Sequence, residues 1–523
     1  MNTKFVHYPT LFVCMGSVFC ISAAHLELAD AIRRCWTWAA IIVASGYYGG
    51  RLLISHTFIK PLPLDKILKT FCCVGILEIV YASLQLSGMV HSYFCFHSFS
   101  GSFENPAVFG MLLSFCLPVS YYYALKSSAK ESSFWSLVSS LFFLFIILSD
   151  SRTALLSSLF ALLIVSYMEL MQIKSLFRKK YFLFALIIGV IFLVGVLYVY
   201  KPESANGRFL IWSIALGMIA DCPFYGWGTG GFVSQYMNRQ AEYFILNPDS
   251  SFSLLAGEVS HPFNEFILVA VNYGIAVLIG VLVFMGFTLR MILCSMYPQR
   301  GLMASIWVVL NVWCCFSYPF AVPFVWLIIL LLFYVAYGAS VKLHKPKLVS
   351  IGILCICIFS FFVVFSCYKK EFYRIHIQEQ AESNIDDKVM ARYAIMYEDY
   401  KDNRLFLYNY GALLHYTGKY EESLKVLKEC AVRMADYNVR ILMADDFFHL
   451  DMPDSAIKEY RYAHAMVPCR YLPLYYEMKL YQESGDEYRA KELAKIILDK
   501  ANKVKKSPKV RSIKKEAEEI LRK

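Results

Sequence analysis

Long apolar runs fill the first two thirds of the chain and limit what it can fold into. A helix that crosses the hydrocarbon core of a bilayer needs roughly 20 apolar residues. Of all residues 58% are hydrophobic and 17% are charged, whereas a soluble domain carries about a quarter charged residues. We therefore predict an all-α polytopic membrane bundle of about 11 spans, at 8–25, 35–54, 67–88, 107–125, 133–150, 152–171, 181–200, 264–290, 301–319, 321–340 and 348–368.

The basic residues between these runs predict the topology. Short cytoplasmic loops collect Lys and Arg. With the N-terminus inside, the outer short loops carry only Arg33, Arg34 and Arg152. The inner loops carry many more, namely Arg51, Lys60, Lys66, Lys126, Lys130, Lys174, Arg178, Lys179, Lys180, Arg290, Arg300, Lys342, Lys345 and Lys347. This asymmetry predicts that residues 201–263 form a long outer loop and that the chain after residue 369 is also outside.

The stretch NGRFLIWSIALGMIAD, residues 206–221, interrupts this pattern. Only twelve residues separate Arg208 from Asp221, too few for a span. We expect a helix that lies along the membrane or packs against the bundle. The alternative is an imperfect twelfth span, which would reverse the orientation of every later segment.

The glycine cluster GWGTGG, residues 226–231, formally satisfies G-x-G-x-x-G. A dinucleotide site needs a strand before this motif and a helix after it. Here an apolar helix precedes it, and we expect a polar loop to follow. We therefore predict that the glycines allow tight turns.

No metal or cofactor site is predicted. His91, Cys95 and His97 share one outer loop, but zinc usually takes four ligands with stricter pairing. We also expect no nucleic-acid partner.

Composition changes after residue 369, where charged residues become frequent and apolar residues periodic. The stretch 407–431 has tetratricopeptide spacing, and two weaker units place Ala456 and Ala490 at similar intervals. Such repeats stack paired helices into a continuous core. We predict two domains, 1–368 with its outer loop 201–263, and a helical repeat domain, 369–523. An unrelated array of helical hairpins is the alternative.

Charged residues at helix mouths in a membrane are functional candidates by default. Four places stand out on the predicted outer face: Arg152 in SDSRTALL, Arg208 at the start of the loop helix, HPFNEF with its histidine and glutamate, and GSFENP at 101–106. Each also has a structural interpretation. The arginines could snorkel or pair with Asp150 or Asp221, and His261 could cap a helix.

Together, these four places resemble the O-antigen ligase and polymerase superfamily of bacterial membrane glycosyltransferases. The family shows a G-T/S-F-x-N-P loop, a Ser-Arg pair opening a span, an Arg and a Trp before a P-x-x-G-x-G loop, and a His-Asn segment starting a span. The counterparts are residues 101–106, Ser151 with Arg152, Arg208 with Trp212, Pro223, Gly226 and Gly228, and finally His261. Pro262 stands where the family often has Asn; either Asn264 takes the place of that residue or the acceptor differs.

The resemblance implies a glycan donor on undecaprenyl diphosphate and an acceptor hydroxyl, in the inner membrane with the site and the repeats in the periplasm. Arg208 and Arg152 would hold the diphosphate, because a guanidinium binds phosphate oxygens bidentately. His261 would take the acceptor's proton. We expect Asn105, Trp212, Gly226, Gly228, Asn264 and Glu265 to bind substrate.

Several alternatives stay open at this point. The acceptor could be lipid A core, as in lipopolysaccharide ligation, another lipid-linked glycan, as in a polymerase, or protein Ser/Thr. The repeat domain slightly favours a protein acceptor or partner. Outside the family, the rivals are a polysaccharide flippase or transporter, which predicts symmetry between halves, and a scaffold built on the repeats.

Overall fold

The computed structural model describes residues 7–19, 26–55, 63–92, 97–170, 195, 199, 202–337, 346–501, 503 and 507–522. Within these residues the secondary structure is helical, with no β-strand, so the all-α prediction is confirmed. The chain divides into two compact units. We call residues 1–197, 263–265 and 281–375 the bundle unit, and residues 198–262, 266–280 and 376–523 the loop–repeat unit.

Six described helices are long and apolar enough to cross a membrane, which confirms a polytopic helical membrane protein. They are α3 (Leu64–Leu86), α4 (Pro106–Lys126), α5 (Ala129–Leu148), α6 (Arg152–Leu170), α10 (Glu265–Leu293) and α13 (Pro346–Ser383). Four further helices overlap predicted spans: α1 (His7–Phe19), α2 (Leu26–Ser55), α11 (Arg300–Phe316) and α12 (Pro323–Tyr337). The predicted span 181–200 lies almost wholly outside the described residues.

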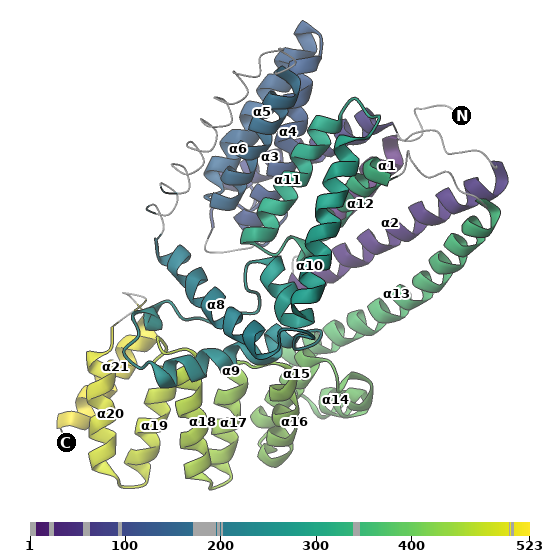
Figure 1. The fold of residues 1–523 in the computed structure, drawn as a ribbon. Coiled ribbons are helices and arrows are strands. Elements are labelled where there is room, and N and C mark those ends of the chain that lie inside the picture. Colours follow the sequence, from purple (N-terminus) through teal and green to yellow (C-terminus); the bar gives the residue numbers. More distant parts are fainter. Residues whose placement is uncertain are drawn as a thin grey trace. The chain divides into compact units, whose positions relative to one another are not determined.

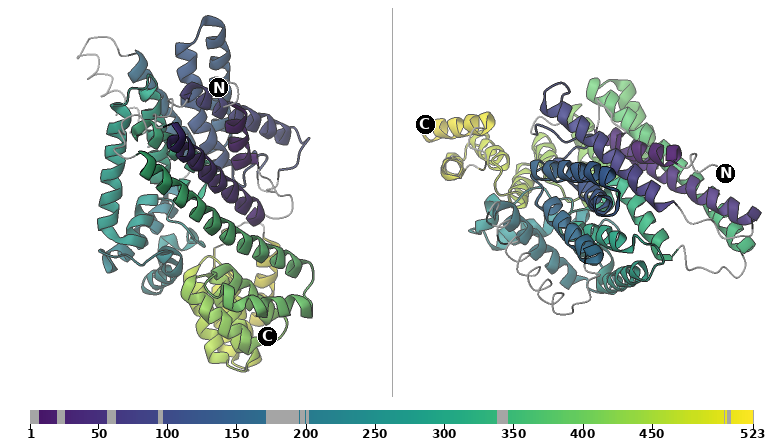
Figure 2. Two further views of the ribbon diagram at one scale, coloured as in Figure 1. Left: turned by 90° about the vertical axis from the view of Figure 1, so that its right-hand side faces the viewer. Right: turned by 90° about the horizontal axis from the view of Figure 1, so that it is seen from above.

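The bundle unit is built around α4, which is buried on nearly every side. It contacts α3, α5, α6 and α11, and the helices α3 to α6 lie side by side (Figures 1 and 2). The indole Nε1 of Trp313 on α11 donates a hydrogen bond of 3.0 Å to Ser114 Oγ on α4. A buried polar pair of this kind fixes the register of two otherwise apolar helices.

The apolar part of α13 stays largely exposed, including Ile356, Phe359 and Phe362. Such a surface is expected for a helix that faces lipid, because lipid tails replace the protein core as its apolar environment. The helix continues without a break past residue 369, the predicted domain boundary, to Ser383. The change in composition at residue 369 therefore falls inside a helix.

The predicted outer loop contains α8 (Pro202–Asp221), α9 (Gly231–Leu246) and the 3-10 helix η2 (Ser251–Leu254). As expected, α8 is not among the helices that qualify as spans. The expectation of a polar loop after the glycine cluster is wrong, because α9 begins at Gly231. Its buried residues recur at helical spacing, a pattern that frequent polar residues conceal in the sequence.

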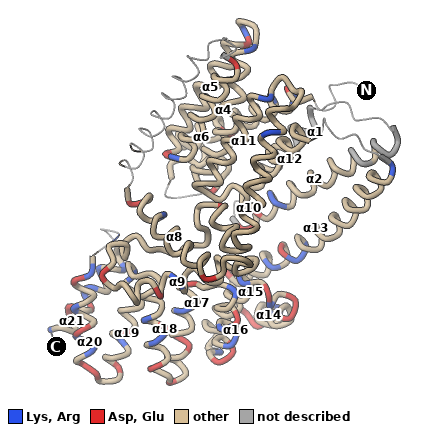
Figure 3. Tube along the Cα trace, viewed as in Figure 1, with Lys and Arg blue, Asp and Glu red and all other residues tan. Residues whose placement is uncertain are grey.

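The C-terminal part is a series of antiparallel helices in which each packs on the next. We call these the repeat helices: α14 (Asp387–Tyr400), α15 (Arg404–Tyr416), α16 (Tyr420–Arg433), α17 (Tyr437–His449), α18 (Pro453–Met466), α19 (Leu472–Glu483), α20 (Glu487–Asp499) and α21 (Pro508–Arg522). Charged residues are frequent along them and sparse in the apolar helices (Figure 3). A Cβ on Gly411 would lie 2.5 Å from Leu427, so this hairpin needs a small residue there. The tetratricopeptide assignment stays a prediction.

Candidate functional site

One face of α8 carries two of the predicted site residues. Arg208 and Trp212 are four positions apart, so their side chains lie one helical turn from each other. The indole Nε1 of Trp212 donates a hydrogen bond of 2.9 Å to the carbonyl oxygen of Pro262. Because Pro262 follows His261 directly, this bond brings the backbone at the predicted base to the helix that carries Arg208.

His261 lies in a segment, residues 256–264, that has no regular secondary structure. Burial and, to a smaller extent, the positive charge of Arg404 lower the pKa of His261 below its ordinary value of 6.5. The imidazole is therefore neutral at pH 7, the form that accepts a proton. Two residues later, Phe263 has a φ of 52°, a left-handed conformation that is strained for a bulky side chain and that recurs at functional sites.

The glycine cluster packs against a break in α10. Gly274 interrupts that helix with φ 85° and ψ 171°. The amide of Trp227 donates to Val271 O at 2.8 Å. Similarly, Ile275 N donates to Pro223 O at 2.8 Å. Backbone N–H and C=O groups without hydrogen-bond partners are costly inside a membrane. This loop supplies partners for the two backbone groups of α10, Val271 O and Ile275 N, that the break at Gly274 leaves without an intrahelical bond.

As predicted, the glycines allow a tight turn, and they also allow a close approach of the backbone to α10. Gly226, Gly228 and Gly230 all have positive φ. A Cβ on Gly226 would lie 2.5 Å from the backbone of Asn272. The amides of Gly226 and Gly228 donate to Cys222 O and Asn272 O, so both are used within the protein. Substrate binding at Gly226 and Gly228 stays a prediction that would depend on the shape of the turn.

In the bundle unit, the loop 101–106 leads into α4. The side chain of Asn105 accepts a hydrogen bond of 2.8 Å from Ala107 N and caps the helix, with Pro106 at its first position. Gly101 has φ 64°, and a Cβ there would lie 2.2 Å from Glu78 Oε2. These motif residues therefore have structural roles, and the substrate role of Asn105 stays a prediction.

Two polar side chains of α3, passed over in the sequence, hold this loop. The fully buried Glu78 accepts a hydrogen bond of 3.0 Å from Ser102 N through Oε2. Gln85 accepts from the amides of Ser100 and Gly101 and donates to Gly101 O. The sequence does carry a signal for Glu78, because a carboxylate inside an apolar run is a functional candidate by default.

Arg33 on α2 completes the surroundings of the loop. It is almost fully buried, donates to the carbonyl oxygen of Ser102 and lies 5.4 Å from the ring centroid of Phe103. Burial and the nearby Asp30 raise the pKa of Glu104 to about 6, against the opposite effect of the arginines on α2. The loop thus presents a carboxyl group that titrates close to neutral pH.

Arg152 is the first residue of α6. The turn before it contains Ser151, whose hydroxyl accepts a hydrogen bond of 3.3 Å from Ala154 N. A Cβ on Gly110 of α4 would lie 3.1 Å from the Ala154 side chain, so the first turns of α4 and α6 are neighbours. The structure thus places Arg152 and the loop that ends at Asn105 at the same end of the bundle.

Glu265 and Asn264 stand where α10 begins. The Glu265 side chain is largely buried and accepts a hydrogen bond of 3.2 Å from Phe320 N, which joins the start of α10 to the turn before α12. Asn264 is half-buried and directly precedes the helix. Their predicted substrate contacts stay predictions.

Asp221, one candidate counter-ion for Arg208, forms an ion pair of 2.9 Å with Arg239 on α9. Arg239 also pairs with Glu242 and lies 5.3 Å from the ring centroid of Trp227. It is a partly exposed arginine that pairs with two carboxylates, and it is a suitable comparison for Arg208.

Among the residues that the structure describes, His, Cys, Asp and Glu form no group suited to a metal ion. Cys95, the middle residue of the histidine-containing loop considered above, lies outside them.

Residues 137–285 match the family model of the O-antigen ligases. The matched segment runs from α5 into α10 and includes Arg152, Arg208 and His261, whereas Asn105 lies before it. The class is therefore a multi-pass helical membrane protein with an O-antigen ligase-like domain, and the resemblance predicted from the motifs is confirmed. Such a domain supports a ligase-like, glycosyltransferase-type function that uses a lipid-linked glycan donor and a glycan acceptor in the membrane. No curated protein and no solved structure matches the chain.

Proposed function

We propose that this protein is a bacterial inner-membrane glycosyltransferase that moves a glycan from undecaprenyl diphosphate to an acceptor hydroxyl on the periplasmic face. The observation that carries the proposal is the hydrogen bond from Trp212 to Pro262, because it brings the helix that bears Arg208 to the backbone beside His261. The family match over both segments supports the same chemistry.

In the proposed reaction the acceptor oxygen attacks the anomeric carbon of the glycan, and the bond from that carbon to the diphosphate oxygen breaks. His261 takes the hydroxyl proton as the new glycosidic bond forms. Negative charge develops on the departing lipid diphosphate, and stabilising that charge is the main catalytic demand. Arg208 suits this role because its planar guanidinium can bind two phosphate oxygens at once. Arg152 is proposed as a second phosphate-binding arginine.

The test is transfer by the purified full-length protein in lipid nanodiscs, supplied with undecaprenyl-diphosphate-linked glycan and one acceptor at a time. Lipid A core, a second lipid-linked glycan and a Ser/Thr peptide distinguish ligase, polymerase and protein transferase. His261→Ala should lower turnover by roughly 10²–10⁴-fold, the usual contribution of a general base. The exposed His376 provides the control, since His376→Ala should be neutral. Activity should persist with a chelator, because the scheme needs no metal.

The proposed orientation is tested separately with reporter fusions at Gly231 and Asp402. Both should report a periplasmic location. A cytoplasmic result for Asp402 alone would mean that α8 spans the membrane and that the proposed topology is wrong.

A further inference from the structure

The outer-loop helix α9 packs directly on the repeat helices. It contacts α18 and α16, and one face of it is buried, formed by Tyr236, Met237, Gln240, Ala241 and Phe244. The backbone also takes part, because Ala435 N donates a hydrogen bond of 3.1 Å to Val233 O. The repeat helices therefore hold α9 of the outer loop through a packed interface that includes a backbone hydrogen bond.

Gln240 is the buried centre of this interface. Its side chain is fully buried. Its Nε2 donates to Met466 O at the end of α18 (2.6 Å) and to Gly257 O in the segment that leads to His261 (3.0 Å). Its Oε1 accepts from the hydroxyl of Tyr236 at 3.0 Å. A single amide thus joins α9, the repeat helices and the segment before His261.

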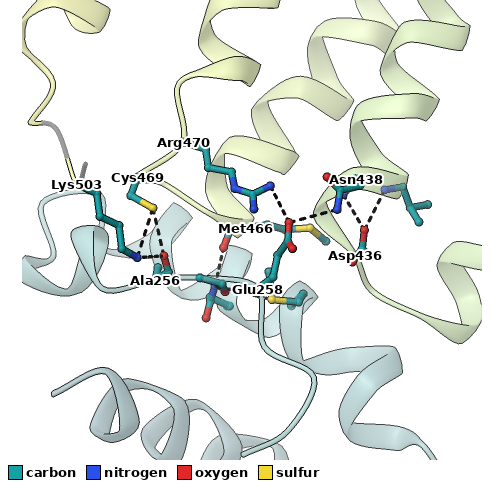
Figure 4. A network of polar contacts seen from close by, with 12 residues as sticks. Ala256, Glu258, Asp436, Asn438, Met466, Cys469, Arg470 and Lys503 are labelled. Atoms are coloured by element: carbon teal, nitrogen blue, oxygen red, sulfur yellow. Dashed lines mark hydrogen bonds and ion pairs between the residues drawn. The ribbon is translucent and has the colours of Figure 1, made fainter. Parts of the chain in front are cut away.

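Contacts on both sides of Gly257 attach the same segment to the repeat helices (Figure 4). The carbonyl oxygen of Ala256 accepts from Cys469 Sγ at 3.3 Å and from Lys503 Nζ at 3.4 Å. The Glu258 carboxylate pairs with Arg470 at 2.7 Å and accepts from Asn438 Nδ2 at 3.4 Å.

The partners of Glu258 are themselves held in place. The Arg470 guanidinium lies 4.3 Å from the ring centroid of the buried Tyr437. The backbone amide of Asn438 donates a hydrogen bond of 2.7 Å to Asp436, the N-cap of α17. The contacts to Glu258 therefore come from residues that have further partners of their own.

These contacts limit where His261 can lie. His261 is three positions after Glu258, and three residues of extended chain reach at most about 10 Å. On the other side, Pro262 O is held by Trp212. The segment has no regular secondary structure of its own, and these two attachments hold it on either side of His261.

We propose that Gln240 and Arg470 are positioning residues for His261, and that the repeat helices are a structural part of the reaction site as well as a surface for partners. This inference rests on the proposed function, because it assumes that His261 takes part in glycan transfer. A base displaced by about 1 Å can lose 10²-fold in rate. The repeat helices should therefore affect turnover even with acceptors that never contact them.

The test uses the full-length protein in nanodiscs with Gln240→Met, which keeps the length of the side chain and removes both donated hydrogen bonds. Gln235→Met, on the same helix, is the matched control. A second pair compares Arg470→Ala with Arg433→Ala, because Arg433 forms a similar ion pair of 2.8 Å with Asp402 within the repeat helices. The measurements are kcat, KM for the lipid-linked donor, and hydrogen exchange of the amides at 257–261.

Gln240→Met should lower kcat about 10–100-fold, leave the donor KM within about twofold, and speed exchange at 257–261. Arg470→Ala should also lower kcat, by a smaller factor, leave the donor KM unchanged and speed exchange at 257–261. Arg470→Lys should recover part of the lost kcat. Both controls should behave as wild type.

The inference is overturned if Gln240→Met has wild-type kcat or unchanged exchange at 257–261 although His261→Ala shows its expected loss of turnover. Wild-type turnover in His261→Ala instead overturns the proposed role of His261, and this inference with it. If Gln240→Met fails to fold, the Arg470 pair decides, because that ion pair is partly exposed and its loss should leave the fold intact.

Discussion

Trp212 and Pro262 are fifty residues apart in the chain and are joined by a hydrogen bond of 2.9 Å from the indole nitrogen to the backbone oxygen. The bond attaches a helix that begins before the predicted arginine to the residue after the predicted histidine. If the proposed chemistry is correct, Trp212 transmits the position of α8 to His261, although it takes no part in proton transfer.

Trp212→Phe tests this relationship. Phe keeps most of the ring and removes the donor, so we expect a cost of about 1–2 kcal/mol in unfolding free energy and a fall of about tenfold in kcat. Trp227→Phe is the control, because Trp227 Nε1 donates a similar bond of 2.8 Å to Met218 O. Equal losses of activity in the two variants would show that Trp212 acts only on stability.

Arg208→Lys tests phosphate binding. Lys keeps the charge but loses the planar fork that binds two oxygens. We expect kcat to fall about 10²–10³-fold, nearly as far as in Arg208→Ala, as when a single charge-stabilising donor is removed. Arg239→Lys, in which Lys can still pair with Asp221 and Glu242, should have little effect. A fully active Arg208→Lys enzyme would indicate a purely structural arginine.

The dependence of transfer on pH reports the state of His261. A base must be neutral, so kcat/KM should fall as the pH drops through its pKa, which burial and Arg404 hold below 6.5. Arg404→Gln removes a positive charge that disfavours the protonated imidazole. The acidic limb should therefore move to higher pH, with the plateau unchanged. Arg433→Gln should leave the profile in place, and the same shift in both variants would argue against a local effect.

Gly226→Ala tests the contact between the glycine cluster and the break in α10. Ala would have to adopt φ 65° with its Cβ 2.5 Å from backbone atoms of Asn272. We expect a loss of about 1–3 kcal/mol in stability, seen as a lower melting temperature in detergent. Gly217→Ala in α8 has open space and no unusual φ, so it should be neutral or stabilising, by up to about 1 kcal/mol. A neutral Gly226→Ala would mean that the loop does not pack as described.

Glu78→Ala tests the clamp on the loop 101–106. It leaves the buried amide of Ser102 without its acceptor, which costs about 1–3 kcal/mol. Glu78→Gln retains an oxygen at that position and should recover most of the stability. Glu131→Ala, at the start of α5, should melt as wild type does. If Glu78→Ala is as stable as Glu78→Gln, the hydrogen bond to Ser102 contributes little.

Much of the candidate site was readable because its signals are local. Arg208 and Trp212 are one turn apart in any helix, and charges at helix mouths stand out against an apolar background. Glu78 was readable by the same rule and was missed. The contacts of Gln240 could not be read, because its partners are backbone carbonyls, Met466 O and Gly257 O, which any residue type provides.

The class of this protein, a multi-pass helical membrane protein, follows from its amino-acid sequence alone. The length of an apolar run indicates membrane helices because the hydrocarbon core of a bilayer is about 30 Å thick, and too few apolar residues lie between Arg208 and Asp221 for a span. Two features became visible only in the folded chain. The loop around the glycine cluster forms hydrogen bonds with the α10 backbone where Gly274 breaks that helix, and the repeat helices hold the segment before His261. Those outcomes depend on hydrogen bonds between residues far apart in the chain, and local composition carries no record of such partners.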